Sequence, residues 1–265
     1  MNDNKKAIFL DLDGTVVDHG DVLYDSAITA IQTAIKNGHR VFICTGRERS
    51  FIAQKIFDIG ATDGVFGAGS SVVCDGKFIF KSSFTAEQYE KIIEVLFKHK
   101  ACFALENDEG ELIPEGMFER DLTAQNALLA IGAKMIPSVP KTANDIDKII
   151  YILADSDRPV LQAQLEGVCE IIASSYLEDD RGGEVMQVGI TKEHGIRQIM
   201  EYYGIEQADT ICVGDSNNDF EMVQFCNLGI AMGNSCERLK AVADFISTDI
   251  KEDGLFNALK FAGVI

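Results

Sequence analysis

Short apolar runs alternate with amphipathic stretches at both ends of this chain. Residues 7–12, 40–44 and 210–213 are largely apolar runs, typical of strands that are buried on both faces of a parallel sheet. Residues 24–36 and 193–203 instead place apolar side chains at helical spacing. Strands and helices that alternate in this way predict a doubly wound, Rossmann-like α/β fold.

Further elements extend the same pattern. Helices are expected over residues 48–59 and 219–226, and a strand over 228–231. The apolar runs on either side of Asp75-Gly76 predict a hairpin with a two-residue turn.

The pattern changes near residue 84. A long amphipathic helix is expected over 85–100, followed by short strands, a turn at 107–110 and a helix over 160–174. All four prolines lie in this stretch. The sequence therefore predicts an α/β core made of residues 1–83 and 186–265, interrupted by an inserted α+β domain at 84–185.

Composition limits the functional class. A hydrophobic content of 46% in 265 residues is ordinary for a soluble globular protein, and no apolar run approaches the roughly 20 residues of a membrane helix. The seven cysteines are odd in number and lack Cys-x-x-Cys spacing, so a reducing cytoplasm is expected. The net charge of −18 argues against nucleic acid and anionic membrane as partners. We expect a monomer.

The first candidate site is Asp11-Leu12-Asp13-Gly14-Thr15, where the opening strand ends. Two carboxylates placed two residues apart project to the same side and repel each other unless a cation or a shared proton lies between them. One interpretation is a metal-assisted site in which one aspartate attacks and the other transfers a proton. The alternative is an ordinary Asp-Gly turn that leaves a strand.

The second candidate is Thr45-Gly46-Arg47, which follows the strand over 40–44. The free amides of such a loop, together with a helix dipole, can hold a phosphate. The alternative is a capping box between Thr45 and Glu48. A cysteine phosphatase loop is excluded, because neither arginine after Cys44 has the required spacing of five intervening residues.

The third candidate is the strand that runs into Asp215. A calcium loop is excluded there, because Phe220 and Cys226 stand where a glycine and a glutamate are needed. The alternative to a functional carboxylate at this strand end is an Asx-rich helix start.

The fourth candidate is Lys192, which opposes the dipole at the start of a helix. It is either functional or merely solvated.

These positions belong together in an open parallel sheet, where ligands bind outside the carboxyl ends of the strands. In chain order, Asp-x-Asp-Gly-Thr, Thr-Gly-Arg, Lys and Gly-Asp-x-x-Asn-Asp resemble the motifs of the haloacid dehalogenase superfamily. The insert between the second and third motifs is similar to the large α/β cap of Cof-like phosphatases. The resemblance spans essentially the whole chain.

The resemblance implies a role for each matched residue. Asp11 would be the nucleophile, and Asp13 would protonate the leaving alcohol and then activate water. Mg²⁺ would be held by the Asp11 side chain, the Asp13 backbone carbonyl and Asp215. The phosphate would be surrounded by Leu12, Thr45, Gly46, Arg47, Lys192 and Asn218.

The implied activity is a magnesium-dependent phosphatase acting on a small phosphorylated metabolite such as a sugar phosphate. The alternative is a phosphotransferase or mutase that uses the same residues. A signalling receiver domain is about half this size and has no counterpart of Asp13, and a catalytically dead sensor would be expected to lose one of the aspartates.

Three features leave the substrate open. Glu193-His194 separates Lys192 from the glycine that usually follows it in such families, and Ala68-Gly69-Ser70 stands where Asn-Gly is frequent. In the insert, Glu184 opens an otherwise apolar run. It is either a solvated residue at a strand end or an acceptor for substrate hydroxyls.

Overall fold

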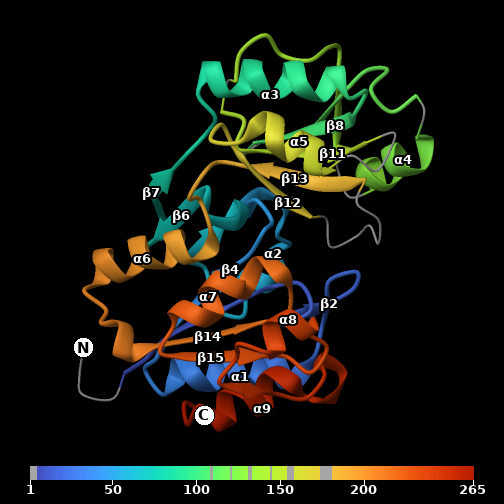
Figure 1. The fold of residues 1–265 in the computed structure, drawn as a ribbon. Helices are drawn as coiled ribbons and strands as arrows, with labels where there is room; N and C mark the ends of the chain where they lie inside the picture. Colours follow the sequence, from blue (N-terminus) through green and yellow to red (C-terminus); the bar gives the residue numbers. More distant parts are fainter. Residues whose placement is uncertain are drawn as a thin grey trace. The chain divides into compact units, whose positions relative to one another are not determined.

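The computed structural model describes residues 5–107, 110–119, 121–130, 133–143, 145–153, 158–173 and 181–265. The chain forms two compact units, shown in Figure 1. The core unit is Met1–Lys81 with Thr191–Ile265, and the insert unit is Ser82–Ile190. No helix in the part of the chain that the structure describes is long and apolar enough to cross a membrane.

The core unit is built on an eight-stranded sheet in the order β16-β15-β14-β1-β4-β5-β6-β7. The neighbouring strands from β16 to β5 are parallel, and β6 and β7 add an antiparallel hairpin. The predicted parallel-sheet α/β core is thereby confirmed. The bounds are β1 Ala7–Leu10, β4 Arg40–Cys44, β5 Gly64–Phe66, β6 Ser71–Cys74, β7 Lys77–Lys81, β14 Thr210–Gly214, β15 Leu228–Ala231 and β16 Phe245–Ile246.

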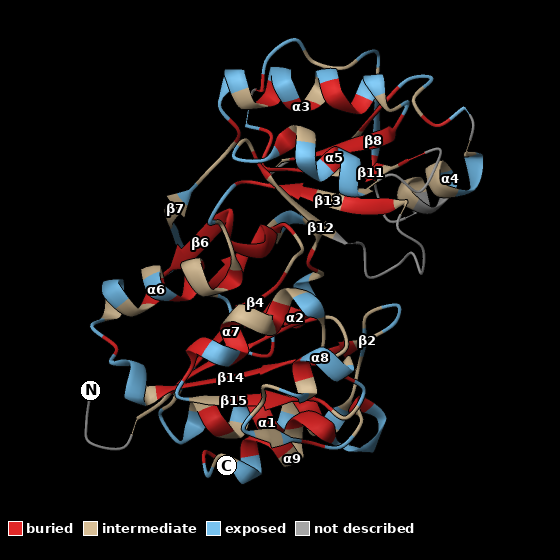
Figure 2. Ribbon diagram, in the orientation of Figure 1, coloured by how far each residue is buried: buried red, intermediate tan, exposed pale blue. Residues whose placement is uncertain are grey.

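Helices cover both faces of this sheet, and Figure 2 shows the strands between them as buried. Ile8 and Leu10 of β1 belong to the apolar cluster that includes residues of α1 and α9, whereas Phe9 belongs to the cluster of α6, α7 and α8. Successive side chains of a strand point to opposite faces, so every position of β1 is buried. The bounds are α1 Asp25–Lys36, α6 Lys192–Tyr203, α7 Phe220–Phe225, α8 Glu237–Lys240 and α9 Gly254–Phe261.

Two shorter features of the core unit follow local turn chemistry. Asp75 and Gly76 have φ angles of 50° and 71°, as a two-residue hairpin turn requires, so the predicted hairpin β6–β7 is present. A small two-stranded sheet pairs β2 (Val17–Asp18) with β3 (Val22–Leu23) just after the Asp11–Thr15 segment.

The single helix expected over residues 48–59 is wrong. The segment holds a 3-10 turn, Arg49–Phe51, and a four-residue helix, α2 (Gln54–Phe57). Glu48 is extended (ψ 149°) and buried, and its carboxylate accepts a hydrogen bond from Ser70 Oγ at 3.0 Å. This tertiary bond removes Glu48 from any capping box with Thr45 and overrides the local helical pattern.

The insert unit contains a six-stranded sheet in the order β10-β9-β8-β11-β13-β12, antiparallel except for the pair β10–β9. Helices α3 and α5 contact each other, and both contribute to the apolar cluster that buries Phe103 and Tyr151. The bounds are α3 Ala86–Lys98, α4 Leu122–Ala130, α5 Arg158–Leu165, β8 Cys102–Asn107, β9 Gly110–Pro114, β10 Lys134–Ile136, β11 Lys148–Ile152, β12 Glu170–Ala173 and β13 Gly182–Met186.

The helix expected over 160–174 is wrong in its second half. It ends at Leu165, and Gly167 follows with φ +74°, a conformation that terminates helices. Ile171 and Ile172 then belong to β12, which pairs antiparallel with β13. Residue 174, and residues 108–109 of the expected turn at 107–110, lie outside the described residues.

Candidate active site

Carboxylates cluster at the carboxyl ends of two neighbouring strands. Asp11 follows β1 and Asp215 follows β14, and these strands pair in parallel register with Leu10 opposite Val213. Oxygens of Asp11, Asp215 and Asp219 all lie within 4.8 Å of one another. The backbone turns away beside them at Gly14, where φ is +81° and an added Cβ would lie 2.2 Å from Asp215 Oδ2. Only glycine therefore fits this turn.

Lys192 joins the cluster from the first position of α6. Its side chain is 1% exposed, and Nζ lies 2.6 Å from both Asp11 Oδ1 and Asp219 Oδ1. Burial acts to lower the pKa of Lys192, but the two carboxylates outweigh it and raise the pKa above its ordinary value. The lysine is therefore not solvated, and its charge is compensated by the two acids it contacts.

Two glycines explain how α6 reaches this position. A Cβ on Gly195, one turn into α6, would lie 2.4 Å from Val65 Cγ1 of β5. A Cβ on Gly69 would lie 2.2 Å from the carbonyl oxygen of Thr191, the N-cap residue of α6. The close approach of the helix to the sheet places the start of α6, and with it Lys192, against the strand ends.

Asp219 anchors the site, and the sequence analysis assigned it no role there. It is fully buried, and its Oδ2 accepts hydrogen bonds from the backbone amides of Asp215 at 3.0 Å and Ser216 at 2.9 Å. Its other oxygen is held by Lys192. The available signal was the Ser216-x-x-Asp219 spacing of a capping box, which directs the Asp219 carboxylate to the amides just past β14.

The electrostatics of the cluster favour a bound cation. Burial and the charge of Asp219 raise the pKa of Asp11, against the opposing effect of Lys192, and the same two causes raise the pKa of Asp215 to about 7. Among the described residues, Asp215 Oδ1 is a buried oxygen without a hydrogen-bond partner. Oxygen donors with excess negative charge suit a hard divalent cation such as Mg²⁺.

The Thr45 segment lies at the end of β4, next to β1 in the sheet. Thr45 is fully buried, and its Oγ1 accepts a hydrogen bond from the Arg47 amide at 3.1 Å. A Cβ on Gly46 would lie 3.4 Å from Asn218 Nδ2, so the structure brings the second and fourth sequence motifs together. Leu12, between Asp11 and Asp13 in the first motif, is buried, and its carbonyl accepts hydrogen bonds from the amides of Val16 and Val17.

The side chain of Asp13 has a different ion-pair partner from that of Asp11. Its side chain is 40% exposed and forms an ion pair with Arg47, whose Nε donates to Oδ2 at 2.8 Å and whose Nη2 donates to Oδ1. The Arg47 Nη1 lies 2.9 Å from Asp21 Oδ1. The site thus has a buried acid beside a lysine and a more exposed acid beside an arginine.

Comparison with known proteins identifies the family. A sequence profile of the haloacid dehalogenase-like hydrolases matches residues 8–259. The chain belongs to the haloacid dehalogenase-like hydrolases. The resemblance drawn from the four motifs is confirmed.

Individual relatives match over nearly their whole length. The hydrolase is 25% identical to the putative phosphatase YkrA of Bacillus subtilis, with 99% of both chains covered. It is 24% identical to the 5-amino-6-(5-phospho-D-ribitylamino)uracil phosphatase YitU of the same organism, with 96% of both chains covered. Its fold resembles that of BT1666 from Bacteroides thetaiotaomicron, with a TM-score of 0.85, 24% identity and coverage of 98% and 96%.

Asn234 is a further residue at this edge that the sequence analysis missed. It follows β15 closely, and its Nδ2 donates to the Gly14 carbonyl at 2.8 Å and lies 3.5 Å from Asp215 Oδ2. Its Oδ1 accepts from the Ile250 amide at 3.0 Å. A search for polar residues just past every predicted strand end would have found it.

The unusual residues after Lys192 are engaged elsewhere. Glu193 pairs with Arg197 one turn along α6 at 2.6 Å, and the His194 ring contacts the Phe80 ring with centroids 4.9 Å apart. Neither contact involves the carboxylate cluster. In this hydrolase the glycine displaced to position 195 serves the close contact between α6 and β5.

Glu184 lies in the insert unit, in the middle of β13, and not at a strand end. Its side chain is 25% exposed, and Oε1 lies 3.8 Å from Lys148 Nζ. Lys148 lies 2.7 Å from Glu106 on the other neighbouring strand. The glutamate is thus partly exposed and lies beside a buried pair of charged side chains.

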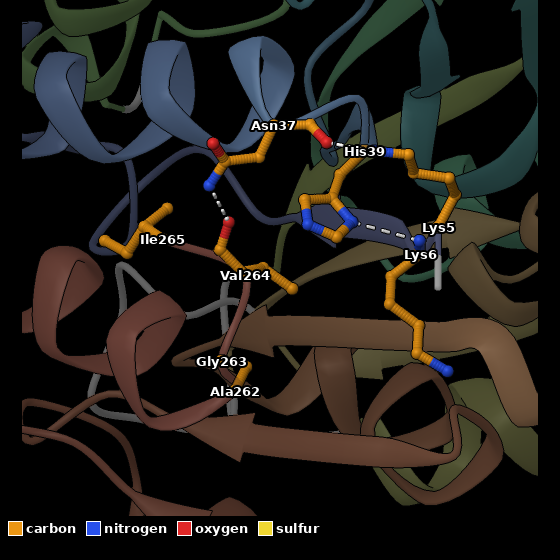
Figure 3. Close-up of a pocket in the computed structure, with 8 residues that line it drawn as sticks. All are labelled: Lys5, Lys6, Asn37, His39, Ala262, Gly263, Val264 and Ile265. Atoms are coloured by element: carbon orange, nitrogen blue, oxygen red, sulfur yellow. Dashed lines mark hydrogen bonds between the residues drawn. The ribbon is translucent and has the colours of Figure 1, made fainter. Parts of the chain in front are cut away.

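A pocket at the opposite edge of the core sheet is drawn in Figure 3. It is lined by residues that precede β1 and β4, among them Lys6 and His39, so it lies at the amino ends of these strands. Lys6 is already bonded to Asp209 at 2.8 Å, and Lys5 Nζ donates to the Asn37 carbonyl. None of the candidate site residues lines this pocket.

Proposed function

We propose that this hydrolase is a magnesium-dependent phosphatase that cleaves a small phosphorylated metabolite through a phosphorylated Asp11. The observation that carries the proposal is the group of Asp11, Lys192, Asp215 and Asp219 at the strand ends, in which all but Asp215 are buried. The names of the relatives agree, since YkrA is a putative phosphatase and YitU acts on a phosphoribityl compound.

Asp11 is the proposed nucleophile because Asp219 and Asp13 are engaged with other partners. Asp219 has both oxygens bonded, to Lys192 and to two backbone amides. Asp13 is paired with Arg47 through both of its oxygens. Burial of Asp11 removes water that would otherwise weaken an attacking carboxylate, and Lys192 keeps that carboxylate in one orientation.

The donor set fits Mg²⁺, which we propose is held by the Asp11 and Asp215 side chains and the Asp13 backbone carbonyl. The buried, unpartnered Oδ1 of Asp215 supports this assignment within the described part of the site. When bound, the cation supplies positive charge to the phosphate oxygens and reduces their repulsion of Asp11.

The phosphate group is proposed to be held by the Leu12 amide, the Thr45 hydroxyl, the Gly46 amide, Lys192 and Asn218. Support comes from the Asn218 side chain, whose Nδ2 lies 3.4 Å from where a Cβ of Gly46 would be, and from the buried charge of Lys192. A single buried lysine and the loop amides supply local positive potential in a chain whose net charge is −18.

Asp13 is the proposed acid and base. In the first step a carboxylate oxygen of Asp11 bonds to phosphorus, the ester P–O bond breaks, and the proton of Asp13 goes to the leaving oxygen. In the second step Asp13 takes a proton from water, whose oxygen bonds to phosphorus while the Asp11–phosphorus bond breaks. The products are an alcohol and inorganic phosphate.

The core motifs are proposed to contact only the phosphate and the metal ion, which are the same for every substrate. We therefore assign discrimination among phosphate esters to the insert unit. We propose that Glu184 accepts hydrogen bonds from substrate hydroxyls, as suits a sugar or polyol phosphate. Its partly exposed carboxylate in a group with Lys148 and Glu106 supports this role.

Glu184→Ala is expected to lower kcat/KM for the best sugar phosphate by roughly ten- to a hundred-fold, mainly through KM. Losing one hydrogen bond to a charged acceptor costs about 1.5–3 kcal/mol. Turnover of p-nitrophenyl phosphate should stay nearly unchanged, because it has no hydroxyls to bind. Glu90→Ala, at an exposed position on α3, is the matched control. Equal losses on both substrates would show a structural role for Glu184.

The activity itself is tested by measuring phosphate release from a panel of phosphorylated sugars, sugar alcohols, nucleotides and cofactors. The proposal predicts free phosphate as the product. Recovery of the phosphoryl group on a second sugar hydroxyl would instead show a phosphotransferase or mutase. A monomeric, cytoplasmic enzyme is part of the proposal, and its cytoplasmic location is supported by cysteines that form no disulfide bond among the described residues.

A further inference from the structure

Arg47 is engaged by two acids from different segments of the core unit. Its Nε and Nη2 bond both oxygens of Asp13, and its Nη1 lies 2.9 Å from Asp21 Oδ1. All three guanidinium nitrogens therefore face carboxylates. The motif resemblance implied that Arg47 contacts the phosphate, and Asp21 belongs to none of the four motifs.

The position of Asp21 is itself fixed. Asp21 lies in the turn between β2 and β3, with φ 57°, next to Gly20 with φ 74°. Its carbonyl oxygen accepts a hydrogen bond from Lys55 Nζ of α2 at 2.8 Å. The hairpin that leaves the Asp11–Thr15 segment thus returns a carboxylate to the far side of Arg47.

The shape of the guanidinium decides what this arrangement can do. A planar group with donors in a fixed fork fixes the plane of a carboxylate that it binds through two nitrogens. The third nitrogen is used by Asp21, so the guanidinium cannot rotate without breaking a second ion pair. The three side chains are 27% to 40% exposed, and ion pairs in such contact with solvent add little to the stability of the fold. Their main consequence is therefore the orientation of the Asp13 carboxyl group.

We propose that Asp21 and Arg47 are positioning residues for Asp13: the Asp21–Arg47 pair fixes the orientation of the Asp13 carboxyl group and stabilises the carboxylate that remains after its proton passes to the leaving oxygen. The inference rests on the proposed acid role of Asp13. It goes further by adding Asp21 to the machinery and by assigning Arg47 to the acid and not to the phosphate.

The orientation of Asp13 matters most when the leaving group needs a proton. An alkoxide leaves poorly, so cleavage of a sugar phosphate requires the proton of Asp13 as the P–O bond breaks. A p-nitrophenolate leaves without protonation. Since kcat/KM reports events up to departure of the leaving group, the ratio of kcat/KM for the two substrates isolates the function of Asp13.

The test compares Asp21→Gly, Arg47→Ala and the double variant on a sugar phosphate and on p-nitrophenyl phosphate. Glycine suits the positive φ of residue 21, so the first variant removes the carboxylate without backbone strain. Asp18→Asn is the matched control, because Asp18 lies in the same hairpin and bonds Tyr24. Thermal unfolding of each variant verifies that it is folded.

For Asp21→Gly we expect kcat/KM on the sugar phosphate to fall ~10-fold, with p-nitrophenyl phosphate changed less than ~2-fold. Arg47→Ala should show the same split, and adding Asp21→Gly to it should cause no further loss, because the two act in series. Asp21→Glu should recover part of the lost activity.

Three results would overturn the inference. An unchanged Asp21→Gly enzyme would show that Asp21 does not act on Asp13, and equal losses on both substrates in Arg47→Ala would return Arg47 to the phosphate. Additive losses in the double variant would also contradict action in series. The proposed function is checked separately with Asp13→Ala: if that variant shows no split between the substrates, the acid role of Asp13 itself is wrong.

Discussion

Replacing Asp11 by asparagine is expected to lower phosphate release by at least ~10³-fold, because an amide does not attack phosphorus and is a weaker ligand for a cation. The amide is close in size to the carboxylate, so the surrounding packing is kept. The measurement is steady-state phosphate release from the best substrate in the presence of Mg²⁺.

The stability of the Asp11→Asn variant separates a chemical effect from a structural one. Burial and Asp219 raise the pKa of Asp11, which means that the folded protein disfavours the ionised form. A neutral amide relieves this effect, so the unfolding temperature in chelator should hold or rise. Asp25→Asn, at an exposed position on α1, is the control and should leave both activity and stability unchanged. Near-normal turnover of Asp11→Asn would refute the proposed nucleophile.

Removal of divalent cations is the second change with a large expected effect. Activity should vanish in chelator and return when Mg²⁺ is added, because the cluster of Asp11, Asp215 and Asp219 carries uncompensated negative charge toward an anionic substrate. Calcium should inhibit, since its larger and looser coordination misplaces the attacking oxygen.

Binding of Mg²⁺ can also be followed without measuring activity. Mg²⁺ should raise the unfolding temperature of the wild-type protein, and Asp215→Asn should abolish this increase, because it removes the buried oxygen that lacks a hydrogen-bond partner in the described site. Full activity in chelator, or activation by zinc at the expense of magnesium, would contradict the assignment of a hard-cation site.

The sheet and the strand-end positions of the site residues could be predicted from sequence. An apolar run such as the one over 7–12 is compatible with few structures other than a buried strand. Polar residues just past such strands meet at one edge of a parallel sheet. The structure brings Asp11, Asp215 and Lys192 together as this rule requires. Their chemical roles remain predictions.

The errors at Glu48, Asp219 and Asp21 came from tertiary contacts that local patterns do not contain, whereas Gly167 was a local signal for the early end of the helix over 160–174. The helix over 48–59 failed because the Glu48 carboxylate bonds Ser70, which is distant in sequence. Asp219 was read as a helix start, yet its side chain bonds Lys192 from another segment. Asp21 lies in a short hairpin whose only sequence signal is a turn-forming Gly-Asp pair, and its contact with Arg47 depends on the path of the whole chain.

The most direct test of the central claim is detection of the phosphoryl group on Asp11. Asp13→Ala should be mixed with p-nitrophenyl phosphate and Mg²⁺, quenched in acid and analysed by peptide mass spectrometry. This substrate needs no proton for the first step, while loss of the base slows the second. We expect a burst of nitrophenol that approaches one equivalent per enzyme, with one phosphoryl group on the peptide that contains Asp11. A steady release without a burst, or a phosphoryl group on any other residue, would contradict the proposed mechanism.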